Sequence, residues 1–575
     1  MNTNSWIDFR ALLPAALGKK PADLVLKGGR VLNVFTGEIE TLDIAVSQGA
    51  IVGLGSYSGL EEIDVAGLFL SPGLIDPHFH IESSMVAPAE LARAIVPRGV
   101  TAAVADPHEI ANVLGLRGID YLIESSRDIP LDLFFMAPSC VPATHLETSG
   151  AVLEAEDLKP LLKDPDVPGL AEVMNFPGVI MGSTSIWDKV ELFSKKPIDG
   201  HAPLLSGPEL AAYLLAGVGS DHECTRLEEA REKLARGMRI FIRQGSQAQN
   251  LADLLPLVTD DNFRRISFCT DDCHSEDIIS KGHLDHVVRL AVSLGLSPAR
   301  ALIMATHNAA EAHRLRRRGA LAPGYLADLV VFDSPESLQA KMVFKNGRLM
   351  ARDGCMTVDI PRASMPDWVS PMNLAPLSLA ALEVKTAGPR VQVIELVPNQ
   401  ILTSRTIVDA PSRDGLLTAD PARDLARLVV LERHKGTGNI GQGLVRGFGL
   451  QRGALASSVA HDSHNIVAVG MSLPEILVAV RAVEKMRGGL AAANGEELLF
   501  QLPLPIAGLM SDRPAREVGE DCRKARAAAR RLGCVPENPF MVLSFLALPV
   551  IPTLKLTDRG LVDVEAFDFT PLFVK

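Results

Sequence analysis

Two patterns of hydrophobic and polar residues alternate through the middle of the chain. Apolar runs of four to eight residues predict strands that are buried on both faces. They occur in LFLSPGLIDPHFH (68–80), VTAAVADPH (100–108), VPGLAEVMN (167–175) and RISFCTDDC (265–273). Stretches with helical spacing lie between such runs, in APAELARAIVPRG (87–99), SGPELAAYLLAGV (206–218) and LEEAREKLARG (227–237). This alternation predicts an α/β fold with a parallel (β/α)8 barrel over residues 66–318.

The two flanks of this region have a different pattern. Residues 1–65 contain a short, helical leader and then β-branched runs separated by Gly-Gly, Thr-Gly and Gln-Gly turns, and residues 319–360 return to short strands and turns. We therefore expect both flanks to form one small β-sandwich domain, which would bring the two ends of the TIM-like barrel together.

The remaining third of the chain reads as a separate unit. Residues 361–389 are rich in proline and predict a linker, and residues 390–575 predict an α+β domain. Its clearest helix is SLPEILVAVRAVEKMRGG (472–489), in which Ser472 and Glu475 are spaced as a capping box and Gly488 marks the end.

Composition and charge narrow the range of partners. The 575 residues carry a formal net charge of -12 and 5% aromatic residues, which disfavours binding to nucleic acid or to an anionic membrane. Seven cysteines without a CxxC pair predict neither a disulfide framework nor a zinc ribbon. The start of the chain lacks the features of a signal peptide, and no apolar stretch approaches 18 residues. We expect a cytoplasmic protein that acts on a small molecule.

The candidate chemistry lies where predicted strands end. His78 and His80 close the first run, and residues i and i+2 of a strand point the same way, so both imidazoles can face one metal ion. Glu172, His201 and His222 follow in the order of successive strand ends, and strand ends of a barrel converge on one mouth. Taken singly, each of these residues is more often packed or solvated than a ligand.

Two adjacent acids complete the set. Asp271 and Asp272 directly follow an apolar run, in SFCTDDCH. Such acids commonly cap a helix or are solvated, but beside the histidines one of them is expected to bind metal and shuttle a proton. Nitrogen and oxygen ligands suit zinc, iron and manganese alike.

These motifs resemble the amidohydrolase superfamily, and within it the bacterial adenine deaminases. The resemblance rests on motifs distributed from about residue 20 to the end of the chain: PGLIDPHFHIESSM, DPHEIANVLG, PSCVPA, GLAEVMNFPGV, CTDD, GALAPGYLADLVVFD, HDSHNI and LPLPIAGLMS.

The resemblance implies two divalent metal ions, Mn²⁺ or Fe²⁺ before Zn²⁺, in a binuclear centre. One ion would be held by His78, His80 and Asp271 and the other by His201 and His222. Glu172 would bridge them where many relatives use a carboxylated lysine, and GLAEVMNFPG contains no lysine.

The implied reaction is the hydrolytic deamination of adenine to hypoxanthine and ammonia, in purine salvage or catabolism, by a homodimer. Glu172, Asp271 and Glu109 are the expected catalytic residues, with Asp271 preferred to Asp272 as the ligand because family aspartates follow Thr or Ser. Glu109, His108 and Asp272 are candidate purine contacts, although Glu109 and His108 could equally orient the ligands.

Three further motifs leave alternatives. His461, Asp462 and His464 are compatible with a second metal site or a lid, and a structural hydrogen-bond cluster is the plainer interpretation. GTGNIG (436–441) fits a dinucleotide fingerprint, but the glycine-rich residues after it predict no helix. His80 and Glu82 match half of a zinc nucleobase deaminase motif whose P-C-x-x-C half is missing.

Two other functions compete with deamination of adenine. A ring-opening amidohydrolase acting on another cyclic amide or imide is one, but such enzymes usually keep the bridging lysine. A non-catalytic barrel serving as a scaffold is the other, and such a protein is expected to have lost ligands.

Overall fold

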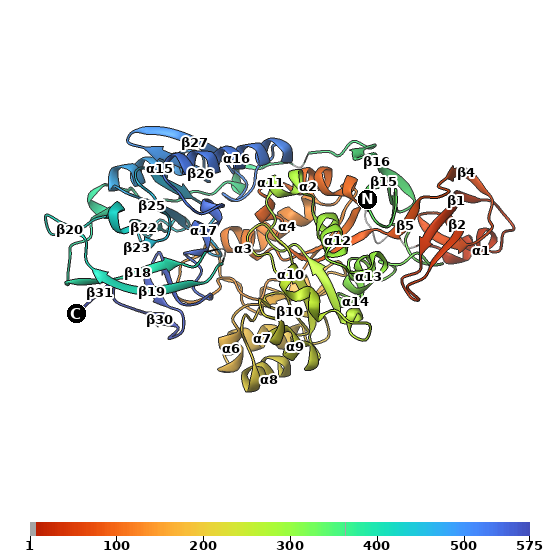
Figure 1. Ribbon diagram of the computed structural model, residues 1–575, viewed down its shortest axis with the longest axis horizontal. Coiled ribbons are helices and arrows are strands. Elements are labelled where there is room, and N and C mark those ends of the chain that lie inside the picture. The colour runs from red at the N-terminus through yellow and green to blue at the C-terminus, as the bar shows by residue number, and fades with distance from the viewer. Residues whose placement is uncertain (1–6, 363, 399) are drawn as a thin grey trace.

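The computed structural model describes residues 7–362, 364–398 and 400–575. These residues form three parts in a row: a sheet built from the flanks, a central barrel, and a C-terminal module (Figure 1). The α/β class expected from the hydrophobic pattern is confirmed.

The flanks of the barrel share one nine-stranded sheet, because β5 pairs with β14 antiparallel across more than 250 residues of sequence. Its strands before the barrel are β1 (Ala22–Leu32), β2 (Ile39–Ser47), β3 (Ala50–Leu54), β4 (Gly59–Asp64) and β5 (Phe69–Pro72). Those after the barrel are β14 (Leu329–Phe332), β15 (Ala340–Lys345), β16 (Arg348–Arg352) and β17 (Cys355–Met356). The sheet order is β17-β16-β15-β14-β5-β1-β2-β3, with β4 beside β1, and helix α1 (Phe9–Ala16) packs on β2 and β3.

The barrel is a closed ring of parallel strands. They are β6 (Leu74–Phe79), β7 (Val100–Ala105), β8 (Asp132–Phe135), β9 (Leu170–Val173), β10 (Ile198–Gly200), β11 (Ser220–Asp221), β12 (Arg239–Arg243) and β13 (Ile266–Cys269). Strands β6 to β10 and strands β11 to β13 pair in chain order, and a parallel bridge between Phe79 and Asp271 joins β13 to β6. Where β10 meets β11, the Gly219 backbone N–H donates to the Ile198 carbonyl at 2.9 Å. The four apolar runs predicted as strands contain β5 and β6, β7, β9 and β13, so those predictions are confirmed.

Helices cover the outside of the ring. They are α2 (Pro88–Ile95), α3 (His108–Leu114), α4 (Leu116–Ser125), α5 (Lys159–Lys163), α6 (Phe176–Ile180), α7 (Thr184–Leu192), α8 (Gly207–Leu215), α9 (Leu227–Ala235), α10 (Leu251–Leu254), α11 (Ser275–Ser280), α12 (Leu284–Ser293), α13 (Pro298–Met304) and α14 (His307–Ala312). The three stretches predicted as helices contain α2, α8 and α9. The apolar faces of these helices pack on the strands. Because the strands are parallel, their carboxyl ends all lie at the same mouth of the barrel.

The C-terminal module is a second nine-stranded sheet with helices on both faces. Its strands are β18 (Arg390–Leu396), β19 (Thr403–Asp409), β22 (Leu425–Leu431), β23 (Ile440–Arg446), β24 (Ala454–Ser457), β25 (Ile466–Gly470), β26 (Gly489–Asn494), β27 (Glu497–Pro503) and β31 (Phe573–Val574). Along β22, Leu428 and Val430 belong to the apolar cluster continuous with the barrel, whereas Val429 and Leu431 pack with α15 (Leu473–Lys485). The sheet therefore uses one face to attach the module to the barrel.

The predicted capping of α15 is confirmed. The Ser472 side chain accepts a hydrogen bond from the backbone N–H of Glu475 at 3.4 Å, and Gly488 adopts φ +119 after the helix. Two further helices, α16 (Ala515–Arg531) and α17 (Pro539–Phe545), lie on the barrel side of the module.

The proline-rich residues between the sheets, described except for position 363, run along both parts. The guanidinium of Arg117 lies 4.2 Å from the centre of the Trp368 ring, and the Val369 carbonyl accepts from the backbone N–H of Ala507. This segment thus touches the barrel and the C-terminal module. Among the described residues, no helix combines the length and the apolar character that crossing a bilayer requires.

Candidate metal centre

The predicted ligands occupy the carboxyl ends of five barrel strands. His78 is in β6 and His80 follows it, Glu172 is in β9, His201 follows β10, His222 follows β11, and Asp271 lies two residues after β13. All six side chains are buried. The structure therefore brings together residues that are separated by as much as 193 positions in the sequence, as the distance from His78 to Asp271 along the chain shows.

Glu172 lies at the centre of this group. Its Oε1 is 3.4 Å from His80 Nε2, and its Oε2 is 2.6 Å from His201 Nδ1 and 3.1 Å from His222 Nε2. Asp271 Oδ1 is 3.2 Å from His80 Nε2 and 3.7 Å from His78 Nε2. Each carboxylate oxygen of Glu172 therefore faces a different set of histidines, which is the arrangement of a bridging carboxylate.

The donor atoms fit divalent cations. His78 Nε2 and His201 Nε2 are buried and have no hydrogen-bond partner among the described residues. Three-residue groups whose ligand atoms all lie within 4.8 Å of one another include His78, His80 and Glu172, as well as Glu172, His201 and His222. Nitrogen and oxygen donors at this spacing suit zinc, manganese or iron.

The surroundings of two histidine rings, His80 and His78, also favour metal binding. His80 Nδ1 lies 3.2 Å from the Asp106 carbonyl, to which it donates, so Nε2 is the nitrogen directed at Glu172 and Asp271. Burial and the neighbouring His222 hold the pKa of His78 well below its ordinary value. The His78 ring is therefore neutral, which is the form that binds a metal ion.

The two adjacent aspartates have different environments. Asp271 points into the ligand group and adopts a left-handed backbone with φ +53. Asp272 lines the same pocket, but its Oδ1 accepts from Ser83 Oγ at 2.5 Å. Both carboxylates have an oxygen within 4.8 Å of a ring nitrogen of His80, and Asp271 also groups with His78 and His222.

Two charged residues in this group were missed from the sequence. Arg243, the last residue of β12, donates from Nη1 to Asp271 Oδ2 at 2.5 Å and pairs through both Nη atoms with Glu223. Glu223 Oε1 lies 3.7 Å from both His201 Nδ1 and His222 Nε2. The signal was present, because Glu223 directly follows a predicted ligand and Arg243 ends an apolar run.

The Arg243 guanidinium changes the protonation state of Asp271. Burial by itself raises the pKa of Asp271, but the positive charge of Arg243 holds that pKa well below the ordinary range. Asp271 is therefore ionised at neutral pH.

Glu109 and His108 lie at the start of α3, beside the ligand group. His108 Nδ1 is 3.6 Å from Glu172 Oε1 and 3.1 Å from Asp106 Oδ2. Both oxygens of Glu109 face histidines of the C-terminal module: Oε1 accepts from His461 Nδ1 at 2.6 Å, and Oε2 contacts His464 Nε2. The structure therefore joins the DPHE and HDSHN motifs at the interface between the two parts.

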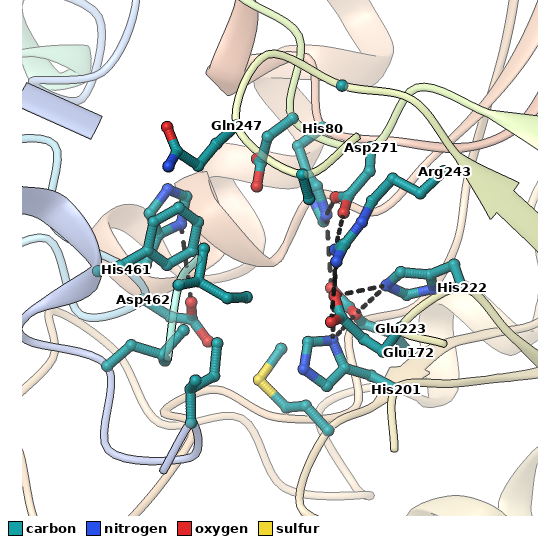
Figure 2. A pocket seen from close by; sticks show the side chains of 18 of the residues that line it. His80, Glu172, His201, His222, Glu223, Arg243, Gln247, Asp271, His461 and Asp462 are labelled. Carbon is teal, nitrogen blue, oxygen red and sulfur yellow. Dashed lines mark hydrogen bonds and ion pairs between the residues drawn. The ribbon is translucent and has the colours of Figure 1, made fainter. Parts of the chain in front are cut away.

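The pocket over the ligand group has two walls, which face each other in Figure 2. His80, Glu172, His201, His222 and Asp271 stand on the barrel side. The opposite wall comes from the C-terminal module, whose lining residues are Ile401, His461, Asp462, Phe545, Leu548 and Ile551. At the rim, a Cβ on Gly245 would lie 2.6 Å from the carbonyl oxygens of Thr270 and Asp272, so only glycine fits there.

The remaining motifs do not join the pocket's ligands. Glu82 Oε1 accepts from the backbone N–H of Ile110 at 3.0 Å. GTGNIG forms a loop that leads into strand β23 at Ile440, so the prediction that no helix begins there is confirmed.

The chain matches two family models. The amidohydrolase family model matches residues 69–350, and the model of the adenine deaminase C-terminal domain matches residues 400–568.

Several proteins named adenine deaminase are similar over nearly the whole chain. The protein of Desulfatibacillum aliphaticivorans is 49% identical over 567 residues, covering 98% of this chain and 99% of its own. That of Dehalococcoides mccartyi (strain ATCC BAA-2266 / KCTC 15142 / 195) is 48% identical over 562 residues, covering 97% and 98%. Adenine deaminase 2 of Carboxydothermus hydrogenoformans is 49% identical over 566 residues, covering 98% and 99%.

Solved structures are more distant. The β-aspartyl dipeptidase of Fervidobacterium islandicum AW-1 is 17% identical with a TM-score of 0.44, covering 59% of this chain and 99% of its own. The dihydropyrimidinase of Brevibacillus agri NCHU1002 is 13% identical with a TM-score of 0.45, covering 58% and 96%.

Proposed function

The chain belongs to the adenine deaminase family, and on this basis we propose that it catalyses the hydrolysis of adenine to hypoxanthine and ammonia. The observation that carries the proposal is Glu172, whose two oxygens face separate histidines at the mouth of the barrel. This arrangement suits a binuclear metal-dependent hydrolase.

We assign one ion to His78, His80 and Asp271 and the other to His201 and His222, with Glu172 between them. Mn²⁺ and Fe²⁺ are the metals we propose first, with Zn²⁺ as a third candidate for the same donors. When bound, two divalent ions would supply a hydroxide nucleophile at neutral pH.

The protein's own groups would manage the proton. Asp271, ionised beside Arg243, would accept a proton as water adds to C6 of the purine and pass it to the departing amine. The hydrogen bond from Arg243 to Oδ2 holds this carboxylate in place during the transfer.

We propose different roles for the candidates around Asp271. His108 and Asp272 line the pocket and are proposed to contact the purine. Glu109 has both oxygens against His461 and His464, so we propose that it supports catalysis by positioning those groups. This role differs from both roles that the sequence left open for Glu109, which were contact with the purine and orientation of the metal ligands.

The cellular setting is proposed on chemical grounds. Adenine and hypoxanthine are free bases of purine salvage or catabolism, and a net charge of -12 disfavours nucleic acid and anionic membranes as partners. We propose that the enzyme works in the cytoplasm as a homodimer.

The test is ammonia release from a panel of purines and cyclic imides, using protein reconstituted separately with Mn²⁺, Fe²⁺ or Zn²⁺. We expect turnover of adenine that depends on added metal. Glu172→Ala should lose bound metal and activity together, by a factor of about 100 or more, because it removes the group between both ions. Elemental analysis checks the metal content.

Turnover of a cyclic imide without turnover of adenine would reject the deaminase assignment. Full activity of Glu172→Ala would reject the bridging role, and wild-type protein that binds none of the three metals and turns over no substrate would favour a scaffold.

A further inference from the structure

The C-terminal module contributes a whole wall of the active-site pocket. The wall is mostly apolar, and the Phe545 ring stacks on the His461 imidazole with centroids 4.4 Å apart and an interplanar angle of 10°. Such a surface suits a flat heteroaromatic ring. The polar members of this wall, His461 and Asp462, face the ligand group across the pocket (Figure 2).

The loop that carries these residues is held firmly. Glu109 Oε1 accepts from His461 Nδ1 at 2.6 Å. His464 Nδ1 accepts from the Ala460 backbone N–H at 3.2 Å, so the proton of the His464 ring is on Nε2, against Glu109 Oε2. The buried Arg433 donates from Nε to the His464 carbonyl. The position of the loop is therefore fixed before any ligand binds.

Asp462 is the acidic residue of this loop, and its side chain is not fully hydrogen-bonded. It is 2% exposed, and its Oδ2 has no hydrogen-bond partner among the described residues. Its Oδ1 comes only within 3.7 Å of His108 Nε2. A buried carboxylate oxygen without a donor is costly, so its presence in a pocket indicates a donor on the ligand.

The His108 ring lies between Glu172 on the barrel side of the pocket and Asp462 on the opposite wall. Its Nδ1 lies 3.6 Å from Glu172 Oε1, and its Nε2 lies 3.7 Å from Asp462 Oδ1. The His108 imidazole, with one contact on each side, therefore separates the Glu172 carboxylate from the Asp462 carboxylate. A purine whose C6 is directed at the ligand group extends its opposite edge, with N3 and N9, toward Asp462.

We propose that Asp462 accepts a hydrogen bond from the imidazole-ring N–H of adenine and thereby selects the free base over derivatives substituted at N9. This inference rests on the proposed deaminase function. It makes the C-terminal module part of the substrate site, with Glu109 as a positioning residue that acts through His461 and His464.

The experiment compares kcat/KM for adenine and for 9-methyladenine in wild type, Asp462→Asn and Asp462→Ala, each with its metal content measured. The matched control is Asp558→Asn, another buried carboxylate behind the same loop, which accepts from the Thr148 backbone N–H at 2.9 Å and does not line the pocket.

We expect wild type to prefer adenine strongly. Loss of the acceptor should lower kcat/KM for adenine by about 10- to 100-fold in Asp462→Ala, mainly through KM, and by less in Asp462→Asn, whose amide oxygen can still accept. The preference for adenine over 9-methyladenine should shrink by a similar factor, because the methylated base never makes this bond. Asp558→Asn should keep the wild-type preference, and all four proteins should bind the same amount of metal.

Three results would count against the inference. An unchanged ratio of adenine to 9-methyladenine in both Asp462 variants rejects the hydrogen bond. A third equivalent of metal in wild type that is lost in Asp462→Asn makes Asp462 a ligand instead. Wild type that turns over no adenine with any metal rejects the proposed function itself, which separates that failure from a failure of the Asp462 assignment.

Discussion

Neighbouring residues can have opposite environments when they follow a barrel strand, and Asp271 and Asp272 are such a pair. Asp271 is directed at His80 and bonded to Arg243, whereas Asp272 is bonded to Ser83. Burial raises the pKa of Asp272, and the negative charge of Asp271 raises it further. Position relative to the end of the strand thus decides which carboxylate lies against both His78 and His80.

A pair of isosteric substitutions distinguishes the roles of the two aspartates. We expect Asp271→Asn to lose metal from one site and to lower kcat for adenine by about 100-fold or more, because a ligand and proton carrier is removed. Asp272→Asn should keep the wild-type metal content. Elemental analysis and ammonia release provide the readouts, and equal loss of metal in both variants would contradict the assignment.

At the scale of elements, the short strand β28 (Leu554–Thr557) anchors two segments of the pocket wall. Its Lys555 is fully buried and donates from Nζ to the carbonyls of Ile401 and Phe545, each at 3.0 Å. Both carbonyls belong to residues that line the pocket. Because no carboxylate offsets its burial, the pKa of Lys555 is lowered to about 7.

This lysine makes the stability of the protein depend on pH. Below pH 7 both the folded and the unfolded chain carry the proton, so the full cost of burying the charge is present. Between pH 7 and the ordinary value of 10.5, the unfolded chain binds more protons. The free energy of unfolding should therefore rise by up to about 1.4 kcal/mol per pH unit from this group.

Urea unfolding between pH 7 and 10 tests this contribution. We expect the difference in unfolding free energy between wild type and Lys555→Met to change in favour of wild type as pH rises. The exposed Lys435→Met should show a pH-independent difference. Parallel curves for wild type and Lys555→Met would contradict a lowered pKa.

At the scale of the whole molecule, buried apolar residues of the barrel and of the C-terminal module belong to one continuous cluster. Helix α16 packs on α11 so closely that a Cβ on Gly519 would lie 3.1 Å from Glu276 Cα, and Arg526 pairs with Glu276 across the same contact. The pocket lies between these two parts, so its width depends on how they dock.

A bulky residue at this contact should therefore affect catalysis from a distance. We expect Gly519→Leu to lower kcat/KM for adenine by about 10- to 100-fold with metal content unchanged, because it displaces the wall that carries Asp462. Ala527→Leu, at an exposed position of the same helix, serves as the control. Equal activity of the two variants would show that docking does not set the pocket.

The amino-acid sequence alone identified three of the five strands that carry the candidate ligands, namely β6, β9 and β13. An apolar run that ends in a histidine or an acid is a local pattern, because side-chain period and strand length are properties of a few consecutive residues. The runs before His80, Asp106 and Asp271 are strands for this reason. The glycine-rich residues after GTGNIG likewise excluded a helix from local chemistry.

Only the tertiary structure decided which distant groups meet. Arg243 and Glu223 read as ordinary charged residues until β11, β12 and β13 stand side by side. The sequence left Glu109 open between a purine contact and a partner of the ligands, and only the C-terminal module places His461 and His464 against its two oxygens. The physical reason is that a hydrogen bond or an ion pair depends on ångström distances between side chains of different elements. Local periodicity sets only the direction in which each side chain leaves its own element.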